Sequence, residues 1–293
     1  MRRPALILAI MLAFAAPADA AGPRFLPWNN GTTASEPETQ VQRIDADTFV
    51  IRQSIRTNFE APFLYLLFGS DRALLIDSGA GGLRIRPTVE ALIAGWLASH
   101  KRTSIPLTVA HSHGHGDHHE GDSEFANRPD TTVVGLTPQE VAQAFGIRNW
   151  PEDIAIFDLG GRPVSIIPTP GHEPAHIMVH DPQTRLILSG DMLYPGRIYV
   201  PTDQYATFIA SADRLAGFAR RHRIDALLGA HIEMTTTPGK DYGYRDTSHP
   251  NEHPLALPPD AIARIAAAAR QTASNPVNSN QGDFILFPRP PAP

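Results

Sequence analysis

Short apolar runs separated by turn-forming residues dominate the first half of the chain, and they predict a series of strands. The runs are rich in Val, Ile, Leu, Phe and Tyr and occupy Thr48–Gln53, Phe63–Gly69, Ala73–Asp77 and Ile105–Ala110. Between the last two runs, apolar side chains recur at helical spacing from Pro87 to His100. Because a proline is tolerated in the first turn of a helix, this segment is predicted to be helical from its start.

The second half of the chain continues this alternation of strands and helices. Helices are predicted at Pro138–Phe145, Gln204–Arg221 and Pro258–Ala273. Strands are predicted at Thr131–Val134, Val164–Ile167, Ile177–His180, Leu186–Ser189, Ala226–Leu228 and Asp283–Phe287. No repeat or linker divides the pattern. We therefore expect one α/β domain over residues 41–293, with an extended lead-in at residues 21–40 and a loop and helix extension on its C-terminal side.

The first twenty residues have the layout of a secretory signal peptide. Arg2 and Arg3 precede an apolar run at residues 5–16, and a small-residue pattern follows at residues 18–20. The apolar run is shorter than the roughly 20 residues that a membrane-spanning helix needs. The alternatives are a membrane anchor and a buried helix. We predict cleavage after Ala20, and hence a periplasmic or secreted protein without stable membrane insertion.

Composition narrows the classes of function. Of the 293 residues, 42% are hydrophobic and 19% are charged, which is typical of a globular protein and excludes wholesale disorder. A net charge of −5 gives no electrostatic reason to expect a nucleic-acid partner. The absence of cysteine excludes disulfides, thiolate metal sites, iron–sulfur clusters and a cysteine nucleophile. The 13 histidines are therefore the main candidates for chemistry.

A histidine-rich segment follows directly after the predicted strand that ends at Ala110. It spans residues 111–121 and has the sequence HSHGHGDHHEG. In extended backbone His113 and His115 point the same way and can bind one ion. If a helix begins near Asp117, this residue and His118 point from its first turn toward a second ion. Imidazole and carboxylate ligands suit zinc, with iron and manganese as alternatives. A solvated histidine-rich loop is the competing interpretation.

Four more predicted strands deliver side chains of the same chemical type at their carboxyl ends. Asp77 ends one strand, His172 follows a second, and Asp191 and His231 follow two others. Sheets of α/β proteins collect their active sites at the carboxyl ends of strands. This recurrence favours a metal site over a solvated loop.

These five motifs, in this order, resemble those of the metallo-β-lactamase superfamily over about residues 45–235. The resemblance implies a four-layer αβ/βα sandwich with a dinuclear metal site on one edge. The ligands that it implies are His113, His115 and His172 for the first ion, Asp117, His118 and His231 for the second, and Asp191 as the bridging carboxylate. Asp77 is then a structural carboxylate that orients the histidine loop.

The resemblance also implies the reaction. A metal-bridged hydroxide would attack an electrophilic carbonyl, and Asp117 would hold the nucleophile and transfer a proton. The aspartate at position 191 resembles the glyoxalase II, lactonase and arylsulfatase side of the superfamily, because some zinc β-lactamases have cysteine there. We therefore predict an enzyme that cleaves a small-molecule ester, thioester or lactone. The alternatives are a β-lactam hydrolase and a metal-carrying binding protein without turnover, and the oligomeric state is left open.

Two further features bear on the substrate. Tyr194, three residues after the implied bridging carboxylate, resembles the tyrosine that assists carbonyl polarisation in acyl-homoserine lactonases. A packing aromatic is the alternative. Residues 235–257 are polar, aromatic and irregular, and they predict a loop at the rim of the site. Tyr242, Tyr244 and Arg245 are candidate substrate contacts there, and a structural wrap over the core is the alternative.

The remaining histidines have ordinary interpretations. His176 is similar to a position that supports the metal ligands in the family, and His119 is predicted to be an exposed helical residue. Structural or surface roles are predicted for His100, His111, His180, His222, His249 and His253.

Overall fold

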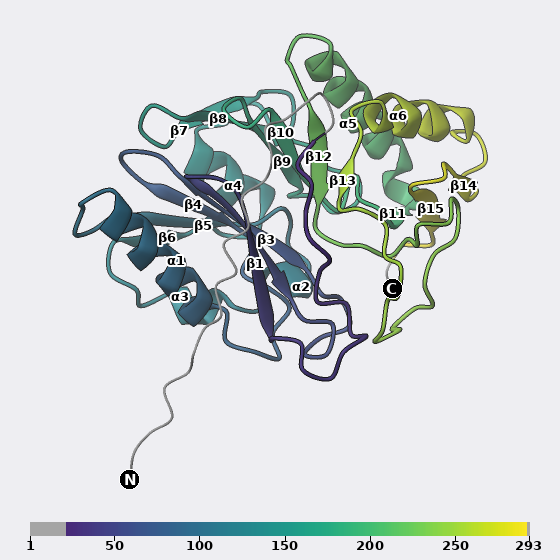
Figure 1. Ribbon diagram of the computed structural model, residues 1–293. Coiled ribbons are helices and arrows are strands. Elements are labelled where there is room, and N and C mark those ends of the chain that lie inside the picture. The colour runs from purple at the N-terminus through teal and green to yellow at the C-terminus, as the bar shows by residue number, and fades with distance from the viewer. Residues whose placement is uncertain (1–21, 292–293) are drawn as a thin grey trace.

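Two six-stranded sheets pack face to face, and helices cover the outer face of each sheet (Figure 1). The computed structural model describes residues 22–291, so the predicted signal peptide lies outside the described residues. The first sheet has the strand order β1-β2-β3-β4-β5-β6. Its strands are Thr39–Asp45 (β1), Thr48–Gln53 (β2), Phe63–Phe68 (β3), Ala73–Ile76 (β4), Leu107–Ala110 (β5) and Thr131–Val133 (β6).

The second sheet has the order β13-β12-β10-β9-β8-β7, and a small third sheet has the order β11-β15-β14. The strands of the second sheet are Ala155–Asp158 (β7), Pro163–Pro168 (β8), Ile177–Asp181 (β9), Leu186–Gly190 (β10), Ala226–Gly229 (β12) and Ala256–Leu257 (β13). The third sheet contains Arg197–Pro201 (β11), Ser279–Asn280 (β14) and Ile285–Arg289 (β15).

Helices connect these strands and complete the layers. They are Arg86–Ser99 (α1), Gly116–His119 (α2), Asp122–Phe125 (α3), Pro138–Phe145 (α4), Tyr205–Ala219 (α5) and Ala261–Gln271 (α6), with a short 3-10 turn at Thr202–Gln204. None of the helices in residues 22–291 combines the length and apolar character needed to cross a membrane.

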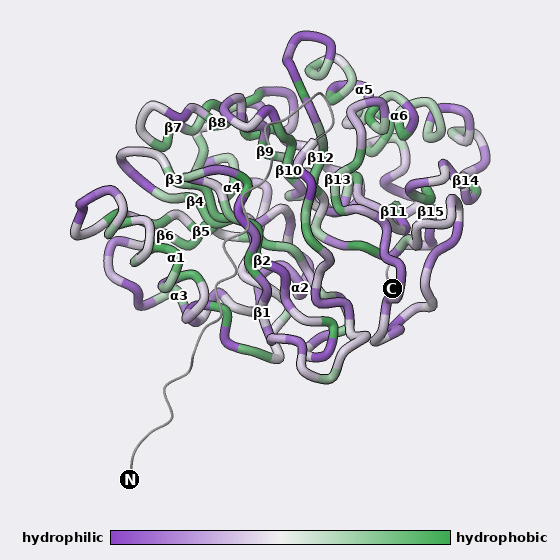
Figure 2. Tube along the Cα trace, in the orientation of Figure 1, coloured by the Kyte–Doolittle hydropathy of each residue, from purple (hydrophilic) through white to green (hydrophobic). Residues whose placement is uncertain are grey.

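The hydrophobic core is divided into three slabs by the two sheets. One slab lies between the sheets and contains Tyr65 of the first sheet and Leu188 of the second. A second slab joins the outer face of the first sheet to α1 through residues such as Trp96. The third joins the second sheet to α5 and α6, with Phe208 at its centre. Apolar positions accordingly run along the strands, whereas the connecting loops are mostly polar (Figure 2). The predicted four-layer αβ/βα sandwich is confirmed.

Strand direction explains why one edge of the sandwich can hold a site. In the first sheet β4 and β5 are parallel. In the second sheet β10 and β12 are parallel, and β8 runs the same way because both β8 and β10 are antiparallel to β9. The carboxyl ends of these five strands are followed by the segments that carry Asp77, the histidine loop, His172, Asp191 and His231.

Local sequence signals fix several elements closely. The predicted strand Thr48–Gln53 and the predicted helix Pro138–Phe145 are found with the same bounds. At the start of α4 the Thr137 side chain accepts a hydrogen bond from the Glu140 N–H, and the Glu140 carboxylate accepts one from the Thr137 N–H. Gly146 ends this helix in the left-handed conformation, at φ +71°.

Five strands were not predicted, and two of them, β13 and β14, contain only two residues each. β1 and β7 are the outer strands of their sheets and carry weak strand signals, because β1 has only Val41 and Ile44 among five polar residues and β7 has only four residues. β11 lies outside both large sheets and pairs with the terminal strand β15. The lead-in has no regular structure from residue 22 to residue 38, and β1 begins within its predicted bounds at Thr39.

Candidate metal centre

The histidine-rich segment folds as an extended loop followed by a short helix. It leaves β5 at Ala110 and enters α2 at Gly116, close to the position at which the sequence predicts a helix. His115 precedes α2 in extended backbone, with φ −76° and ψ 148°. His113 and His115 fall in one donor group and Asp117 and His118 in another, as the spacing predicts.

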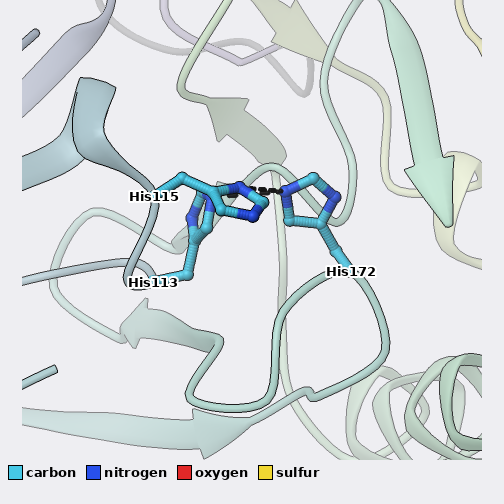
Figure 3. Close-up of side chains that lie close together, drawn as sticks. All are labelled: His113, His115 and His172. Atoms are coloured by element: carbon cyan, nitrogen blue, oxygen red, sulfur yellow. Dashed lines mark hydrogen bonds between the residues drawn. The ribbon is translucent and has the colours of Figure 1, made fainter. Parts of the chain in front are cut away.

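Three imidazoles form the first of two donor groups (Figure 3). His113 Nε2 lies 2.9 Å from His115 Nδ1, and His172 Nε2 lies 3.2 Å and 3.1 Å from the same two atoms. His113 and His172 are buried, whereas His115 is exposed. In Figure 3 the rings of His113 and His115 face the ring of His172, which projects from the opposite loop.

Hydrogen bonds fix the tautomers of two of these rings. His172 Nδ1 must donate to the Tyr199 carbonyl at 2.7 Å, because a carbonyl only accepts. Ser112 Oγ donates to the Asp77 carboxylate, so it accepts from His113 Nδ1 at 3.1 Å. Both Nε2 atoms therefore direct lone pairs at each other. Burial also holds the pKa of His113 well below its usual range, which keeps this imidazole neutral.

The second donor group combines imidazoles with carboxylates. His118 Nε2 and His231 Nε2 lie 3.1 Å and 3.2 Å from the same Asp117 oxygen and 3.5 Å from each other. His231 Nδ1 donates to the main-chain carbonyl of Glu60 at 2.8 Å, so its Nε2 faces the group. Although burial opposes a charged ring, the Asp191 and Asp117 carboxylates raise the pKa of His231 to about 10.

Asp191 lies between the two groups. Its Oδ2 is 3.7 Å from His172 Nε2, and its Oδ1 is 3.4 Å from His231 Nε2 and 3.7 Å from His118 Nε2. This Oδ1 is buried and accepts no hydrogen bond from the described residues. The carboxylate is thus placed to serve both groups at once, which is the arrangement that a bridging ligand requires.

The donor set fits divalent cations. Ligand atoms about 2.1 Å from a tetrahedral zinc ion lie about 3.4 Å apart. The distances from each imidazole to the other donor atoms of its group lie between 2.9 Å and 3.7 Å. Neutral imidazole lone pairs that face each other at hydrogen-bond distance have no proton to share, and a buried carboxylate oxygen without a donor is costly. One cation bound in each group would satisfy all of these atoms.

Asp77 orients part of the centre rather than joining it. One of its oxygens accepts from the Ser112 N–H at 2.6 Å, and the other accepts from His118 Nδ1 at 2.9 Å. Because Nδ1 carries the proton, His118 Nε2 is left free for a metal ion. The side chain lies where the predicted orienting role requires it.

His176 and Gly190 hold the backbone at Asp191. His176 Nε2 accepts from the N–H groups of Asp191 and Met192, at 3.2 Å and 3.3 Å, and its Nδ1 faces Thr169 Oγ1 at 2.8 Å. Gly190 has φ +51°, and a Cβ there would lie 2.7 Å from the Ser112 Cβ. Only glycine lets this strand end approach the histidine loop so closely.

The hydroxyl of Tyr194 is engaged outside the donor groups. It donates to the Arg197 carbonyl at 2.6 Å and lies 3.1 Å from Glu233 Oε2. Its buried ring meets the His231 ring at 5.5 Å between centroids. The geometry thus gives the tyrosine a packing contact with a candidate ligand, and its hydroxyl a role in a neighbouring network.

Two acidic residues at the site were missed by the sequence analysis. Glu60 contributes the carbonyl that fixes His231, and burial raises the pKa of its own carboxyl to about 7. Glu233 accepts from the N–H and the guanidinium of Arg197, at 2.7 Å in each case. Glu233 has a local signal, because it stands two residues after His231. Glu60 has none, since only the fold brings its loop to this edge.

The remaining histidines lie outside the two donor groups. His111 is buried and its Nε2 lies 2.8 Å from the Asp122 carboxylate. His119 is partly exposed on α2. The ring of His249 stacks on Tyr242, at 4.0 Å between centroids.

The segment after His231 is anchored beneath its exposed tip. Glu252 pairs with Arg52 of β2 through two hydrogen bonds of 2.6 Å, and both side chains are buried. The N–H of His249 donates to the Asn30 carbonyl at 2.8 Å. The segment is irregular, as predicted, apart from the two-residue strand β13 at its end. The base of the segment therefore wraps over the core, which is the structural alternative to a substrate-binding loop. Its tip, at Tyr244 and Arg245, is exposed.

Comparisons with known proteins agree with this geometry. The model of the metallo-beta-lactamase superfamily matches residues 58–262. The acyl-coenzyme A thioesterase MBLAC2 of Homo sapiens is 25% identical over 204 residues, which cover 58% of this chain and 72% of that protein. A hydroxyacylglutathione hydrolase of Rhizobium meliloti is 31% identical over 162 residues, 52% of this chain and 59% of that protein.

Solved structures show the same fold. The metallo-beta-lactamase FIM-1 from Pseudomonas aeruginosa, in its mono-zinc form, aligns with a TM-score of 0.53 at 13% identity. The alignment covers 82% of this chain and 99% of that one. Together with the family match, these findings show that the chain belongs to the metallo-beta-lactamase superfamily and is a metal-dependent hydrolase.

Proposed function

We propose that the protein is a dinuclear enzyme that hydrolyses a small-molecule thioester, with esters and lactones as related substrates. The observation that carries this proposal is the position of Asp191, whose two oxygens face two separate groups of donors. The names of two relatives, an acyl-coenzyme A thioesterase and a hydroxyacylglutathione hydrolase, support an acyl group on a thiol carrier as the substrate.

Seven side chains would hold the metal. His113, His115 and His172 would bind one ion, Asp117, His118 and His231 would bind the other, and Asp191 would bridge them. Two divalent cations bound there would lower the pKa of a water molecule and polarise the substrate carbonyl. Zinc suits the imidazole-rich set best, and iron and manganese are the alternatives.

The chain's own side chains would divide the remaining work. Asp117 is the partly exposed carboxylate of the second group, so it is placed to hold the attacking water and to take up its proton. Addition of water to the carbonyl carbon then breaks the C–S bond and gives a carboxylic acid and a thiol. We propose Tyr194 as a positioning residue for His231 in place of a catalytic one, because its hydroxyl already donates to the Arg197 carbonyl.

A substrate panel on metal-loaded protein tests the proposal. The same acyl group is offered as a thioester, an aryl ester and a lactone, together with a phosphodiester and a chromogenic cephalosporin. We expect thioester cleavage to have the highest kcat/KM, and we expect it to disappear on chelation and to return with added zinc. Preferred cleavage of the cephalosporin would instead establish the β-lactam alternative, and thioester turnover in verified metal-free protein would refute the mechanism.

We further propose that the enzyme works outside the cytoplasm after cleavage at Ala20. The support is the arginine-initiated apolar pattern of residues 1–20. Expression of the full chain in a bacterial host, fractionation and N-terminal sequencing test it. A periplasmic product that begins at Ala21 is expected, and an uncleaved cytoplasmic product would contradict the proposal.

A further inference from the structure

A cluster of side chains beside the metal centre takes no part in the proposed reaction. It consists of Phe59, Tyr244 and Arg245, and is called the rim cluster below. The rings of Phe59 and Tyr244 meet edge to face at 5.7 Å between centroids. The guanidinium carbon of Arg245 lies 4.8 Å from the Phe59 ring centre and 5.7 Å from that of Tyr244. Two loops more than 180 positions apart in the sequence thus meet in one group.

The rim cluster adjoins the second donor group. Phe59 precedes Glu60, whose main-chain carbonyl accepts the hydrogen bond from His231 Nδ1 at 2.8 Å. Tyr244 and Arg245 belong to the segment that follows His231 in the chain. A substrate with its carbonyl at the donor groups can therefore extend its other end across these side chains.

A tight turn presents the two residues from the C-terminal segment. The Asp246 N–H donates to the Gly243 carbonyl at 3.1 Å, and the Gly243 N–H donates to the Asp246 carboxylate at 2.7 Å. Tyr244 and Arg245 are the central residues of this turn. Arg245 has φ +67°, a conformation that favours glycine or asparagine at the third position of a turn. The turn geometry alone gives no reason for an arginine at this position.

The exposure and charge of the cluster are unusual for this chain. Tyr244 is 66% exposed, more than any other large apolar side chain in residues 22–291. Within the same residues Arg245 lies over the two rings and forms no ion pair with a carboxylate. By contrast, the nearby Arg197 is held by Glu233 and Asp241. A guanidinium that has no carboxylate partner and lies against aromatic rings is suited to form bidentate hydrogen bonds with a carboxylate or a phosphate.

We propose that the rim cluster is a subsite for an ionised carboxylate or phosphate on the thiol carrier of the substrate. Arg245 pairs with the anion, and the rings of Phe59 and Tyr244 hold the guanidinium and cover the adjoining carrier chain. This inference rests on the proposed thioesterase function.

Kinetics with one acyl group on three carriers test the subsite. N-acetylcysteamine is neutral, glutathione carries carboxylates, and coenzyme A carries phosphates. For Arg245→Ala we expect KM to rise about tenfold with the charged carriers, because one charge-assisted pair is lost. We expect kcat to stay within about twofold, because the lost contact stabilises the bound substrate and the transition state equally. KM for the neutral carrier should not change. Whichever charged carrier shows the larger rise identifies the anion.

Two variants control for unrelated effects. Arg221→Ala removes an exposed arginine that precedes the amino end of β12, whereas the site follows its carboxyl end, so it should leave all three KM values unchanged. Arg245→Lys keeps the charge without the planar fork and should lie between the wild type and Arg245→Ala. Thermal unfolding of each variant confirms that the exposed substitutions leave the fold intact.

Direct binding separates this inference from the proposed function. S-methyl glutathione and S-methyl coenzyme A, which cannot be hydrolysed, are titrated calorimetrically into zinc-loaded wild type and Arg245→Ala. A loss of about tenfold in affinity supports the subsite even if the wild type cleaves no thioester, an outcome that would refute only the proposed function. Equal affinity of the two proteins, or an equal KM rise with the neutral carrier, would overturn the subsite whether or not thioesters are cleaved.

Discussion

The floor of the site and its rim are built by opposite means. The floor consists of the seven donor side chains, and most of them are buried and held by hydrogen bonds to fixed groups, as His172 is held by the Tyr199 carbonyl. The rim consists of the exposed Tyr244 and Arg245 on a turn and the partly exposed Phe59 of another loop, and Arg245 has no charged partner among the described residues. One region is closed by internal contacts, and the other is left open toward solvent.

This difference separates reactivity from recognition. A change to the floor disturbs the groups that would hold the metal, so it should affect every substrate equally. A change to the rim should affect only substrates that carry the matching charge. The two regions meet at a single stretch of chain, where Phe59 belongs to the rim and the carbonyl of Glu60 belongs to the support of the floor. Mutations can therefore test how independent they are.

The largest effect is expected when the shared carboxylate is removed. Asp191→Ala takes one donor from each group, and chelation removes the cations themselves. Because bound metal contributes several kcal/mol to such reactions, we expect kcat/KM to fall at least about a thousandfold in both cases. The loss should be the same for charged and neutral carriers. Steady-state kinetics combined with metal analysis per chain measures both effects.

The control for this experiment is Arg221→Ala, which should retain full metal content and activity. Retention of two metal ions by Asp191→Ala would contradict the bridging role. A loss confined to charged carriers would show that the floor and the rim are not independent.

A large effect on stability is expected where the rim segment is anchored to the core. Glu252→Ala leaves the guanidinium of Arg52, which is fully buried, without its carboxylate partner. Breaking a buried ion pair in this way costs about 3–5 kcal/mol. Urea denaturation should show a corresponding decrease in the free energy of unfolding.

An exposed ion pair provides the matched control for Glu252→Ala. Glu152 is 70% exposed and lies 3.5 Å from Arg214, so Glu152→Ala should cost at most about 1 kcal/mol. Equal and small losses in both variants would show that the Arg52–Glu252 pair does not secure the rim segment.

A smaller effect is expected from the residue that orients His118. In Asp77→Asn, the amide N–H₂ cannot accept the proton of His118 Nδ1, and the ring can then move its proton to Nε2. Supporting residues of this kind typically contribute about 10–100-fold to metal affinity or activity. We expect kcat/KM to fall within that range and to recover in part with excess zinc. Full activity and unchanged zinc affinity in Asp77→Asn would show that Asp77 does not orient His118 for metal binding.

Much of the fold could be predicted because apolar runs and helical spacing are local signals. Buried strands such as β3 and β10 are continuous apolar segments, so their positions follow from the sequence. β1 is mostly polar and β7 has only four residues, and both lie at sheet edges, so neither forms an apolar run long enough to predict a strand. β11 is defined mainly by its pairing with β15, nearly 90 positions later, which no local window contains.

The donor groups could also be predicted, because each donor follows an apolar strand and the fold gathers the strand ends. The supporting contacts were harder to predict. The carbonyl that fixes His231 belongs to Glu60, and any residue type could supply it. The hydrogen-bond partners of the Tyr194 hydroxyl are Arg197 and Glu233. The third sheet and the segment after His231 determine the positions of these two residues. Sequence spacing alone leaves both interpretations of Tyr194 open.

Tyr194→Phe should have the smallest effect and decides between those interpretations. The variant loses a hydrogen bond to the Arg197 carbonyl, while Glu233 keeps its contacts with the Arg197 N–H and guanidinium. We expect unfolding to become easier by about 1 kcal/mol. Turnover should stay within about twofold for every carrier, because the ring that packs on His231 is retained.

Tyr65→Phe is the matched control, because its buried hydroxyl likewise donates to a main-chain carbonyl, that of Gly229, two residues before His231. The two variants should lose similar stability and keep similar kcat values, since each removes one buried hydroxyl close to the same candidate ligand. A fall in kcat of about a hundredfold in Tyr194→Phe alone would restore the catalytic hydroxyl. It would also mean that the Tyr194 hydroxyl leaves the Arg197 carbonyl during turnover.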